Sequence, residues 1–495
     1  MTISRKRIVS NVSILMVSQV IGWGLSLVIT IFLPRYLGAE NYGKLSLAGS
    51  LWIIVVNFAT FGMDTYLTRE IARDRNKLDL LLSQSLLLRL ILFIFGAILL
   101  IVYLMFTDYS PETYQVIAIL AISNFNTLIC GGFIATVQAL ERMEILAYSS
   151  ILGNVLSTVF LFIAMFLGFG LNAFAWIISV VPSIILLFYM TYSLLRLHPF
   201  KFRPSTEDLR GFLTASFSFF LLYILISLYH QSDTVIISLL VDERGVGLYS
   251  AADKLLASIF FIPNIFMTVL FPTFSRLSKE DADKLSKLFR KAIHMMIWLG
   301  TAFGLGTLII SDQIVRLIYG SEYINSGPIL ALKAVVTAGT FCNIILGIYF
   351  MSIDRQKSWL FVLAMGTVSQ IPLNIIFVPL FDRYLGNGAM GAALSCVITE
   401  AGMTIAGIFM LPKQILDRTT VSYFIRTMLA GGCMVAGSWW LRDSFIAIPI
   451  IVGAAIFILI SYVLKLLSGE EWQLLYETIT KATSRIRSKL RNTAS

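Results

Sequence analysis

Residues 11–34 read NVSILMVSQVIGWGLSLVITIFLP, a run without a single charged side chain. Because an α-helix rises about 1.5 Å per residue, this run is long enough to cross about 30 Å of hydrocarbon. It follows the basic residues 5–7 but is too long for the core of a signal peptide, and no small-residue cleavage site follows it. The stretch therefore predicts a first membrane span that is retained in the mature chain.

The rest of the chain repeats this pattern. Of 495 residues, 57% are hydrophobic and 13% are charged, whereas soluble domains carry about 25% charged residues. Strands of a membrane barrel would show alternation with a period of two, which the sequence lacks. We expect an all-α polytopic membrane protein with fourteen transmembrane helices, at approximately 11–34, 43–68, 82–106, 114–140, 146–167, 171–195, 210–240, 246–272, 289–311, 327–353, 358–380, 387–411, 422–441 and 446–466.

The distribution of Lys and Arg predicts the orientation of these spans. With the N-terminus inside, 29 of the 38 basic residues fall in inner connections or the C-terminal tail, and six fall in outer loops. Both termini are therefore expected in the cytoplasm, with the chain in the cell (inner or plasma) membrane. This topology accounts for the net charge of +10, so no nucleic-acid partner is needed.

The tail and the cysteines suggest no further domain. In the tail, 468–495, apolar residues lie near one helical face and basic residues away from it, which predicts either an amphipathic helix on the inner leaflet or a simple solvated tail. The four isolated cysteines lie in apolar runs, so we expect them to be free and buried. The three histidines are too far apart to suggest a metal site, and no cofactor is expected.

An internal echo indicates a repeat. Residues 42–51 read YGKLSLAGSL and residues 246–255 read VGLYSAADKL, so that Gly43 aligns with Gly247 at an offset of 204. A weaker echo pairs LGFGLNAFAW (167–176) with LGNGAMGAAL (385–394). We expect two parallel six-helix lobes, 1–208 and 209–412, related by a pseudo-twofold axis along the membrane normal, with two C-terminal helices at 413–467 outside the repeat.

Four longer stretches resemble a known family. They are LPRYLGAENYGKLSLAGSL with LTREIA, DTVIISLLVDERGVGLYSAADKL, IYGSEY, and NIIFVPLFDRYLGNGAMGAALSCVITE. The chain is similar to the polysaccharide-transporter branch of the multidrug/oligosaccharidyl-lipid/polysaccharide exporters, the Wzx-type flippases. The resemblance implies two six-helix lobes around a central cavity. It also implies movement of polyprenyl-diphosphate-linked oligosaccharides from the cytoplasmic to the outer leaflet, alongside glycosyltransferases and a polysaccharide polymerase.

Polar residues interrupt the seventh span, where SLYHQSDTVIISLL occupies 227–240. At 100° per residue, Ser227, Gln231, Thr234 and Ser238 form a polar stripe consistent with a cavity wall, with His230 beside it. Asp233 lies off the stripe. One interpretation pairs Asp233 with Lys254 or His230 with Asp253 across the hairpin; the other places these charges in the cavity. The two interpretations are compatible.

Further cations are candidates for binding the diphosphate headgroup. Lys254 and Asn264 share a polar face of the eighth span, and an ammonium is a compact partner for phosphate. Arg89, in the third span, could meet the headgroup from the cytoplasmic side or extend to the interface. Lys333, in the tenth span, has the same two interpretations. We therefore expect substrate contacts among Arg89, His230, Gln231, Lys254, Asn264 and Lys333.

Carboxylates within the spans are candidates for coupling transport to an ion. Glu400 lies near the middle of the twelfth span, where it either pairs with a cation from another span or binds H⁺ or Na⁺. Asp64 lies on a polar face near the inner end of the second span and could instead be a solvated interfacial group. Asp233 and Asp253 complete this set.

Other function classes fit less well. GNGAMG (386–391) matches a nucleotide-binding pattern, but no strand precedes it, and the acidic run at 280–283 has no nucleotide-binding domain around it. An enzyme such as a polymerase or ligase should carry a large outer loop, which is missing, so we do not expect an enzyme. A lipid II flippase and a drug/cation antiporter of the same superfamily remain alternatives.

Overall fold

The computed structural model describes residues 5–193, 209–412, 415–469 and 472–473, with side chains from Ser18 onward. Within these ranges the chain forms helices and no strand, which confirms the all-helical prediction for the described part. The expected amphipathic tail, 468–495, lies almost entirely outside the described residues. The structure divides into two compact units, which are considered separately below.

The first unit contains the described residues of 1–259, 314–333 and 357–403. Its elements are α1 (Arg5–Thr60), α2 (Met63–Arg73), η1 (Arg75–Lys77), α3 (Leu78–Leu104), α4 (Pro111–Ala139), α5 (Met143–Phe166), α6 (Leu171–Tyr192), α7 (Leu209–Leu240), α8 (Glu243–Ala257), η4 (Ser321–Tyr323), most of α11 (Ser326–Val335), α13 (Gln356–Leu385) and most of α14 (Gly388–Met410).

The second unit contains the described residues of 260–313, 334–356 and 404–495. Its elements are α9 (Phe261–Glu280), most of α10 (Ala282–Tyr319), α12 (Thr337–Ser352), α15 (Arg418–Ser438), η5 (Trp439–Leu441) and α16 (Ala447–Val463). The short helix η3 (Ser258–Phe260) lies where the chain passes from the first unit to the second.

Ten helices of the described residues are long and apolar enough to cross a membrane, or eleven if α11 and α12 form one bent span. The chain is therefore a multi-pass membrane protein. Some of the fourteen expected spans share one helix, since α1 covers both 11–34 and most of 43–68. Others correspond to shorter helices, such as the apolar α16. The number fourteen stays a prediction.

A break divides α1 into two helices at Gly38. Its backbone has φ 77° and ψ 167°, a conformation that glycine adopts at little cost because it has no Cβ. The second helix begins at Ala39, whose amide donates to Glu322 Oε1 at 2.7 Å. Nearby, Tyr323 Oη donates to the carbonyl of Pro34 at 2.8 Å. Side chains of η4 therefore hold both sides of the break.

The two echo segments meet in the first unit, where α1 and α8 touch backbone to backbone. A Cβ built on Gly43 would lie 1.7 Å from the carbonyl oxygen of Glu243, and one on Gly247 would lie 1.8 Å from that of Ala39. The offset of 204 that aligns Gly43 with Gly247 also aligns Ala39 with Glu243. The contact is therefore reciprocal, as a twofold axis would require, while the full six-helix repeat stays a prediction.

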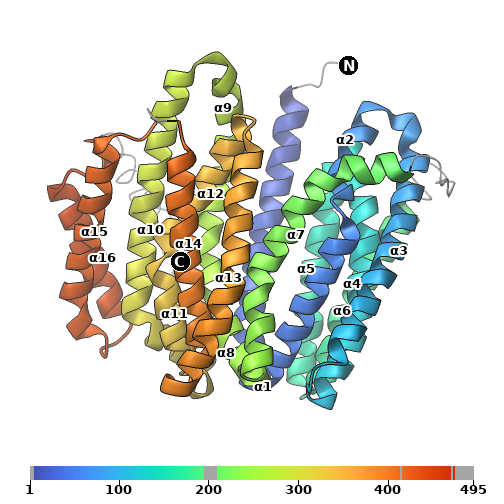
Figure 1. Ribbon diagram of the computed structural model, residues 1–495, viewed down its shortest axis with the longest axis horizontal. Coiled ribbons are helices and arrows are strands. Elements are labelled where there is room, and N and C mark those ends of the chain that lie inside the picture. Colours follow the sequence, from blue (N-terminus) through green and yellow to red (C-terminus); the bar gives the residue numbers. More distant parts are fainter. Residues whose placement is uncertain (1–4, 194–208, 413–414, 470–471, 474–495) are drawn as a thin grey trace, which may run out of the picture. The chain divides into compact units, whose positions relative to one another are not determined.

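Apolar side chains hold the N-terminal helices of the first unit together. One cluster is drawn from α2, α3, α4 and α7 and includes Met63, Leu88 and Phe212. A second, from α3, α4 and α6, includes Leu82 and Tyr189. Helices α3, α4 and α6 lie together in the blue-to-cyan part of Figure 1. Helices α3 and α4 of this packed region also hold the Arg89–Asp64 ion pair described below.

Helix α10 packs against the last two helices in the second unit. Trp298 Nε1 donates to Ser461 Oγ of α16 at 3.0 Å, and its ring lies 5.5 Å from that of Phe457. Gly431 of α15 comes so close to α10 that an added Cβ would lie 2.5 Å from Leu305 Cδ1. The adjacent α15 and α16, in red, are seen in Figure 1.

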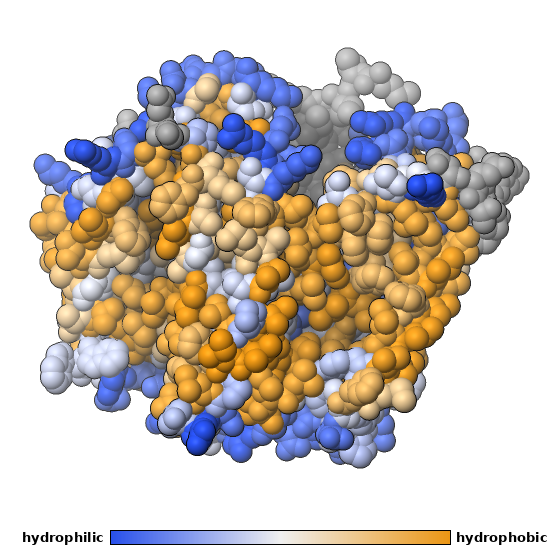
Figure 2. All heavy atoms as spheres, viewed as in Figure 1, coloured by the Kyte–Doolittle hydropathy of each residue, from blue (hydrophilic) through white to orange (hydrophobic). Residues whose placement is uncertain are grey.

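In both units hydrophobic residues cover the middle of the helices and hydrophilic residues gather near the helix ends (Figure 2). Side chains such as Ile91, Ile98 and Val102 of α3 are more than two-fifths exposed, which suits contact with hydrocarbon rather than water. All four cysteines are free, as expected. The expectation that they are buried holds for Cys130 and Cys342 but is wrong for Cys433, which is exposed on α15.

Candidate functional site

A buried carboxylate lies at the centre of the first unit's polar residues. Asp233 of α7 is 4% exposed. Its Oδ1 accepts hydrogen bonds from Gln370 Nε2 at 2.7 Å and Asn374 Nδ2 at 2.6 Å, and its Oδ2 accepts one from Tyr249 Oη. Gln370 and Asn374 are four residues apart, so they project from one face of α13. Three neutral donors from α8 and α13 therefore solvate this carboxylate.

A second carboxylate joins this group through a lysine. Lys333 of α11 is 6% exposed, and its Nζ donates to Tyr249 Oη at 3.1 Å and lies 4.5 Å from the centre of that ring. The same ammonium forms an ion pair with Asp253 of α8, whose side chain is 48% exposed. We call the residues of this connected set the Asp233 network: Asp233, Tyr249, Asp253, Lys333, Gln370 and Asn374.

The network runs from an accessible end at Asp253 to a buried end at Asp233. Burying charges is stable only when each has partners, which the hydrogen bonds and the ion pair supply. The amide oxygens of Gln370 and Asn374 are buried and have no hydrogen-bond partner in the structure. An unsatisfied buried acceptor costs about 1–3 kcal/mol, so two such oxygens beside one carboxylate mark a place suited to a further donor or cation.

The structure gives the hairpin residues partners other than those expected. Neither of the proposed pairs, Asp233 with Lys254 or His230 with Asp253, is the close contact that forms: Asp233 takes neutral donors and Asp253 takes Lys333. His230 and Lys254 are exposed, and both lie within electrostatic range of Asp253. The expectation that Lys333 extends to the interface is wrong, since the side chain is buried.

Arg89 is also buried rather than extended to the interface. It is 0% exposed, its guanidinium pairs with Asp64, and its Nε donates to Ser85 Oγ at 3.0 Å. A third bond goes to the carbonyl of Leu128 on α4. Gly131 leaves the space for this arrangement, because a Cβ there would lie 2.8 Å from Arg89 Nη1. Asp64, with its side chain 43% exposed, is therefore the accessible half of a pair that ties α2, α3 and α4 together.

Glu400 of α14 is 7% exposed, and its Oε1 accepts a hydrogen bond from Tyr229 Oη of α7 at 2.8 Å. A phenol from another span is thus one partner of this carboxylate. Glu400 therefore lies in the same unit as Asp233, and its partner Tyr229 is four residues from Asp233, on the same face of α7.

The remaining candidates are spread over both units. Gln231 is half-buried, whereas the other stripe members Ser227, Thr234 and Ser238 are buried, so most of the expected stripe faces protein. Asn264 lies in the second unit, where it is exposed and its Nδ2 donates to the carbonyl of Phe260 at 2.8 Å.

Sequence reasoning missed Tyr229, Tyr249, Gln370 and Asn374. A signal for the last two was present, since an amide pair spaced four apart interrupts the eleventh span in the way the polar residues interrupt the seventh. The two tyrosines carried no comparable signal, because tyrosine is common in membrane helices.

Comparisons with known proteins place the chain in a family. The family model described as polysaccharide biosynthesis protein matches residues 8–278. Among curated relatives, the chain is 22% identical to a probable low-salt glycan biosynthesis flippase, Agl15 of Haloferax volcanii, over 79% of this chain and 80% of that protein. It is 24% identical to a putative O-antigen transporter of Escherichia coli K12, over 80% of this chain and 94% of that protein.

A shorter match, 24% identical, is to an uncharacterized membrane protein in the cps region of Klebsiella pneumoniae; it spans 41% of this chain and 42% of that protein. Among solved structures, the lipid II flippase MurJ in an inward closed conformation superposes with a TM-score of 0.65 at 14% identity, over 92% of this chain and 98% of that one. An inward-facing multidrug resistance MATE transporter of the MOP superfamily gives 0.64 at 18% identity, over 82% and 95%. These two likenesses show the fold. Because the family model matches more than half of the chain, the protein belongs to the polysaccharide biosynthesis protein family.

Proposed function

We propose that this protein is a flippase. It moves polyprenyl-diphosphate-linked oligosaccharide repeat units from the cytoplasmic to the outer leaflet of the cell membrane during cell-surface polysaccharide synthesis. Membership of the polysaccharide biosynthesis family supports the proposal, as do relatives described as a glycan biosynthesis flippase and an O-antigen transporter. Glycosyltransferases and a polymerase would act before and after it.

One structural observation carries the proposal furthest: ionisable side chains are exposed within two helical stretches, 209–240 and 243–280, that are each long and apolar enough to cross a membrane. His230, Asp253 and Lys254 lie together on α7 and α8, with Asp253 half exposed and the other two exposed. Each charged group in hydrocarbon costs about 2.5–3.5 kcal/mol, so these side chains are stable facing water or a polar headgroup. A transported diphosphate and sugar would supply such surroundings.

The roles of the candidate residues differ with their burial. Lys254, His230 and Gln231 are the accessible ones in the first unit, and we assign them to direct contact with the diphosphate and the first sugar. Asn264, in the second unit, is a separate candidate for a substrate contact. An ammonium is a compact, strongly hydrated charge that binds phosphate without fixed geometry, which suits a headgroup that must also be released. Arg89 and Lys333 are buried, so we assign them an indirect role. They contribute positive charge beneath the protein surface and form ion pairs with Asp64 and Asp253.

Asp233 is the strongest candidate for ion coupling. A coupling Na⁺ prefers oxygen ligands, as hard cations do. Rotating the side-chain amides of Gln370 and Asn374 would exchange their donating nitrogens for the two unpartnered oxygens, so that both oxygens and the carboxylate would face one point. A coupling H⁺ would instead protonate Asp233 directly. Either ion would neutralise the buried carboxylate and change its bond to Tyr249, which links it to Lys333. Asp64 and Asp253 are weaker candidates because each already pairs with a basic side chain. Glu400, which accepts a hydrogen bond from Tyr229, is a second candidate.

The two lobes, 1–208 and 209–412, would alternate the access of a central cavity by rocking. The reciprocal contact of Gly43 and Gly247 supports a twofold relation between the two lobes. This close contact between α1 and α8 would serve as the pivot of the rocking motion. Fourteen spans with both termini in the cytoplasm, including two C-terminal spans at 413–467, complete this arrangement. The excess of Lys and Arg in the assigned inner connections supports the orientation.

A drug/cation antiporter fits less well. A cationic drug needs an accessible carboxylate without its own cation. Of the four candidate carboxylates within the spans, the two accessible ones, Asp64 and Asp253, are each paired with a basic side chain. A lipid II flippase would share the mechanism and differ in the headgroup alone.

Reconstitution tests the proposal directly. Purified protein in vesicles should move a polyprenyl-diphosphate oligosaccharide to the side where a membrane-impermeant glycosidase cleaves it. Lys254→Gln should slow this movement at least several-fold, whereas Lys279→Gln, which removes an exposed charge at the end of α9, should not. Asp233→Asn should abolish the dependence on a Na⁺ or proton gradient. Movement that is unaffected by both Lys254→Gln and Asp233→Asn would refute the assigned roles.

A further inference from the structure

Two carboxylates outside the Asp233 network connect the expected lobes, 1–208 and 209–412, within the first unit. The first is Glu243, at the start of α8, which accepts hydrogen bonds from the amide of Ser110 at 3.1 Å and from Thr113 Oγ1 at 3.0 Å. Ser110 is the residue that caps α4, so the Glu243 carboxylate lies at the positive end of the α4 dipole. A side chain of one lobe is thus bound to a helix start of the other.

The second carboxylate is Glu322 of η4, whose Oε1 accepts a hydrogen bond from the amide of Ala39 at 2.7 Å. Ala39 follows the break at Gly38 and begins the second helix of α1, whose first amides have no partner within the helix. Glu322 therefore also binds a helix start that belongs to the other lobe. Hydrogen bonds to an ionised acceptor are roughly twice as strong as neutral ones.

A tyrosine accompanies each carboxylate. Tyr109 Oη lies 2.8 Å from Ser238 Oγ of α7, within hydrogen-bond distance, and Tyr323 Oη donates to the carbonyl of Pro34 at 2.8 Å. Both bonds again run between the expected lobes. The distribution of Lys and Arg assigns these helix ends to the outer side, so we call the two sets the outer latches. The first consists of Glu243, Tyr109, Ser110, Thr113 and Ser238, and the second of Glu322, Tyr323, Ala39 and Pro34.

The two latches occupy equivalent places in the expected repeat. The offset of 204 that aligns the echo segments also aligns Ala39 with Glu243, so each latch includes the start of one of the two helices that touch backbone to backbone. The partner segments come directly before the expected spans at 114–140 and 327–353, which are the fourth spans of their lobes. Two contacts that are far apart in the sequence therefore follow one twofold relation.

We propose that the two outer latches form the gate that closes the outer side of the transport path, and that both must open before the substrate leaves. The inference rests on the proposed rocking of the lobes and names the residues that hold one end of that cycle. Rocking about the α1–α8 contact separates α4 from α8 and η4 from α1, so each latch loses its bonds between the lobes. Water replaces these bonds at the freed helix starts, which makes the gate strong enough to stay closed and weak enough to open.

The accessibility of a buried position behind the latches tests this gate. Ser250 of α8 is 8% exposed and lies three residues after Gly247, on the helix face that meets α1. The full-length protein carrying Ser250→Cys is treated in a nonionic detergent with a membrane-impermeant maleimide, and peptide mass spectrometry gives the rate of modification at position 250. Glu243→Gln and Glu322→Gln should each raise this rate about five-fold, because a neutral acceptor bonds about half as strongly. Together they should raise it about 25-fold, since independent sites add in free energy.

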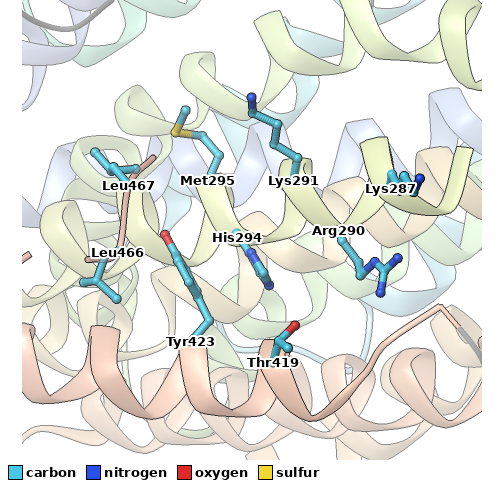
Figure 3. A pocket seen from close by; sticks show the side chains of 9 residues that line it. All are labelled: Lys287, Arg290, Lys291, His294, Met295, Thr419, Tyr423, Leu466 and Leu467. Atoms are coloured by element: carbon cyan, nitrogen blue, oxygen red, sulfur yellow. The ribbon is translucent and has the colours of Figure 1, made fainter. Parts of the chain in front are cut away.

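Two controls remove a carboxylate without touching a contact between the lobes. Glu112→Gln removes a charge from the same start of α4, where its partner Lys44 lies at 2.8 Å in the same lobe. Asp417→Asn removes the cap of α15 in the second unit, beside the pocket of about 340 Å³ that Arg290 and Thr419 help to line in Figure 3. It should lower the Tm and, like Glu112→Gln, leave the rate of modification unchanged.

Faster modification in both latch variants, and in neither control, is the result that the gate predicts. Unchanged rates in the latch variants, a rise in one of them alone, or an equal rise in a control would each overturn it. Thermal unfolding confirms that each variant is folded. If a glutamine variant is not, Tyr109→Phe or Tyr323→Phe replaces it; each removes one hydroxyl from a latch and should also raise the rate. Because the assay uses neither substrate nor transport, its failure would leave the flippase proposal standing.

Discussion

Replacing Gly247 by alanine tests the backbone contact between α1 and α8. The added Cβ would lie 1.8 Å from the carbonyl oxygen of Ala39, whereas ordinary contact begins at 3.4 Å, so the two helices must separate by about 1.5 Å. Such overpacking costs about 1–3 kcal/mol, offset by the roughly 0.5–1 kcal/mol that alanine gains over glycine within a helix. We expect a net loss of about 1–2 kcal/mol for Gly247→Ala, and a similar loss for Gly43→Ala.

The matched control is Gly49→Ala, six residues after Gly43 on α1, where an added Cβ would meet nothing within 4 Å. It should be neutral or slightly stabilising. Thermal unfolding in detergent, followed by size-exclusion fluorescence, would rank the variants. The double variant Gly43→Ala with Gly247→Ala should lose less than the sum of the two single losses, because one separation accommodates both methyl groups. Equal Tm values for Gly247→Ala and Gly49→Ala would refute the reciprocal contact.

Three further predictions concern charge. Asp64→Asn should destabilise the protein by about 3–5 kcal/mol, because it leaves the fully buried guanidinium of Arg89 without its carboxylate. Arg89→Met should cost less, because the carboxylate that it leaves unpaired, Asp64, is partly exposed. Thermal unfolding of both variants checks the order. Asp253→Asn should likewise cost more than Lys333→Met, and the reverse order would contradict the burial seen here. Hydrogen bonds from the Thr419 hydroxyl and the Thr420 backbone amide, with Arg290 close by, lower the pKa of Asp417 to about 2. The stability that this carboxylate contributes is therefore full above pH 4 and lost as the pH falls toward 2. Asp417→Asn should flatten the Tm against pH in that window, and an unchanged profile would show that Asp417 contributes nothing.

The fold class could be predicted from the sequence because each span is a long apolar run. In hydrocarbon the backbone N–H and C=O groups of such a run must bond to one another, and a helix is the structure in which a single segment achieves this. The exact limits were harder. The sequence predicts separate spans at 11–34 and 43–68, whereas in the structure helix continues through the residues between them and is broken at the single residue Gly38. The span at 327–353 divides into α11 and α12 near Val336, which is apolar like its neighbours.

The site was predictable in its residues but not in its pairings. Helical spacing identified Asp233, Lys254 and Asp253 as polar residues of two adjoining spans. It could not show that Lys333, eighty positions from Asp253, would take that carboxylate, since the partner is set by how α11 packs against α8. The burial of Arg89 was missed for the same reason: the space it occupies exists because α4 carries glycine at position 131.

The most direct test of the flippase proposal uses cells that lack this protein. Polyprenyl-diphosphate-linked sugars would be extracted from their membranes, after glycans accessible from outside are labelled in intact cells. We predict that repeat units accumulate and stay unlabelled, on the cytoplasmic leaflet, and that the wild-type chain but not Lys254→Gln restores labelling. Lipid-linked units that still reach the outer leaflet at the normal rate would contradict the proposal.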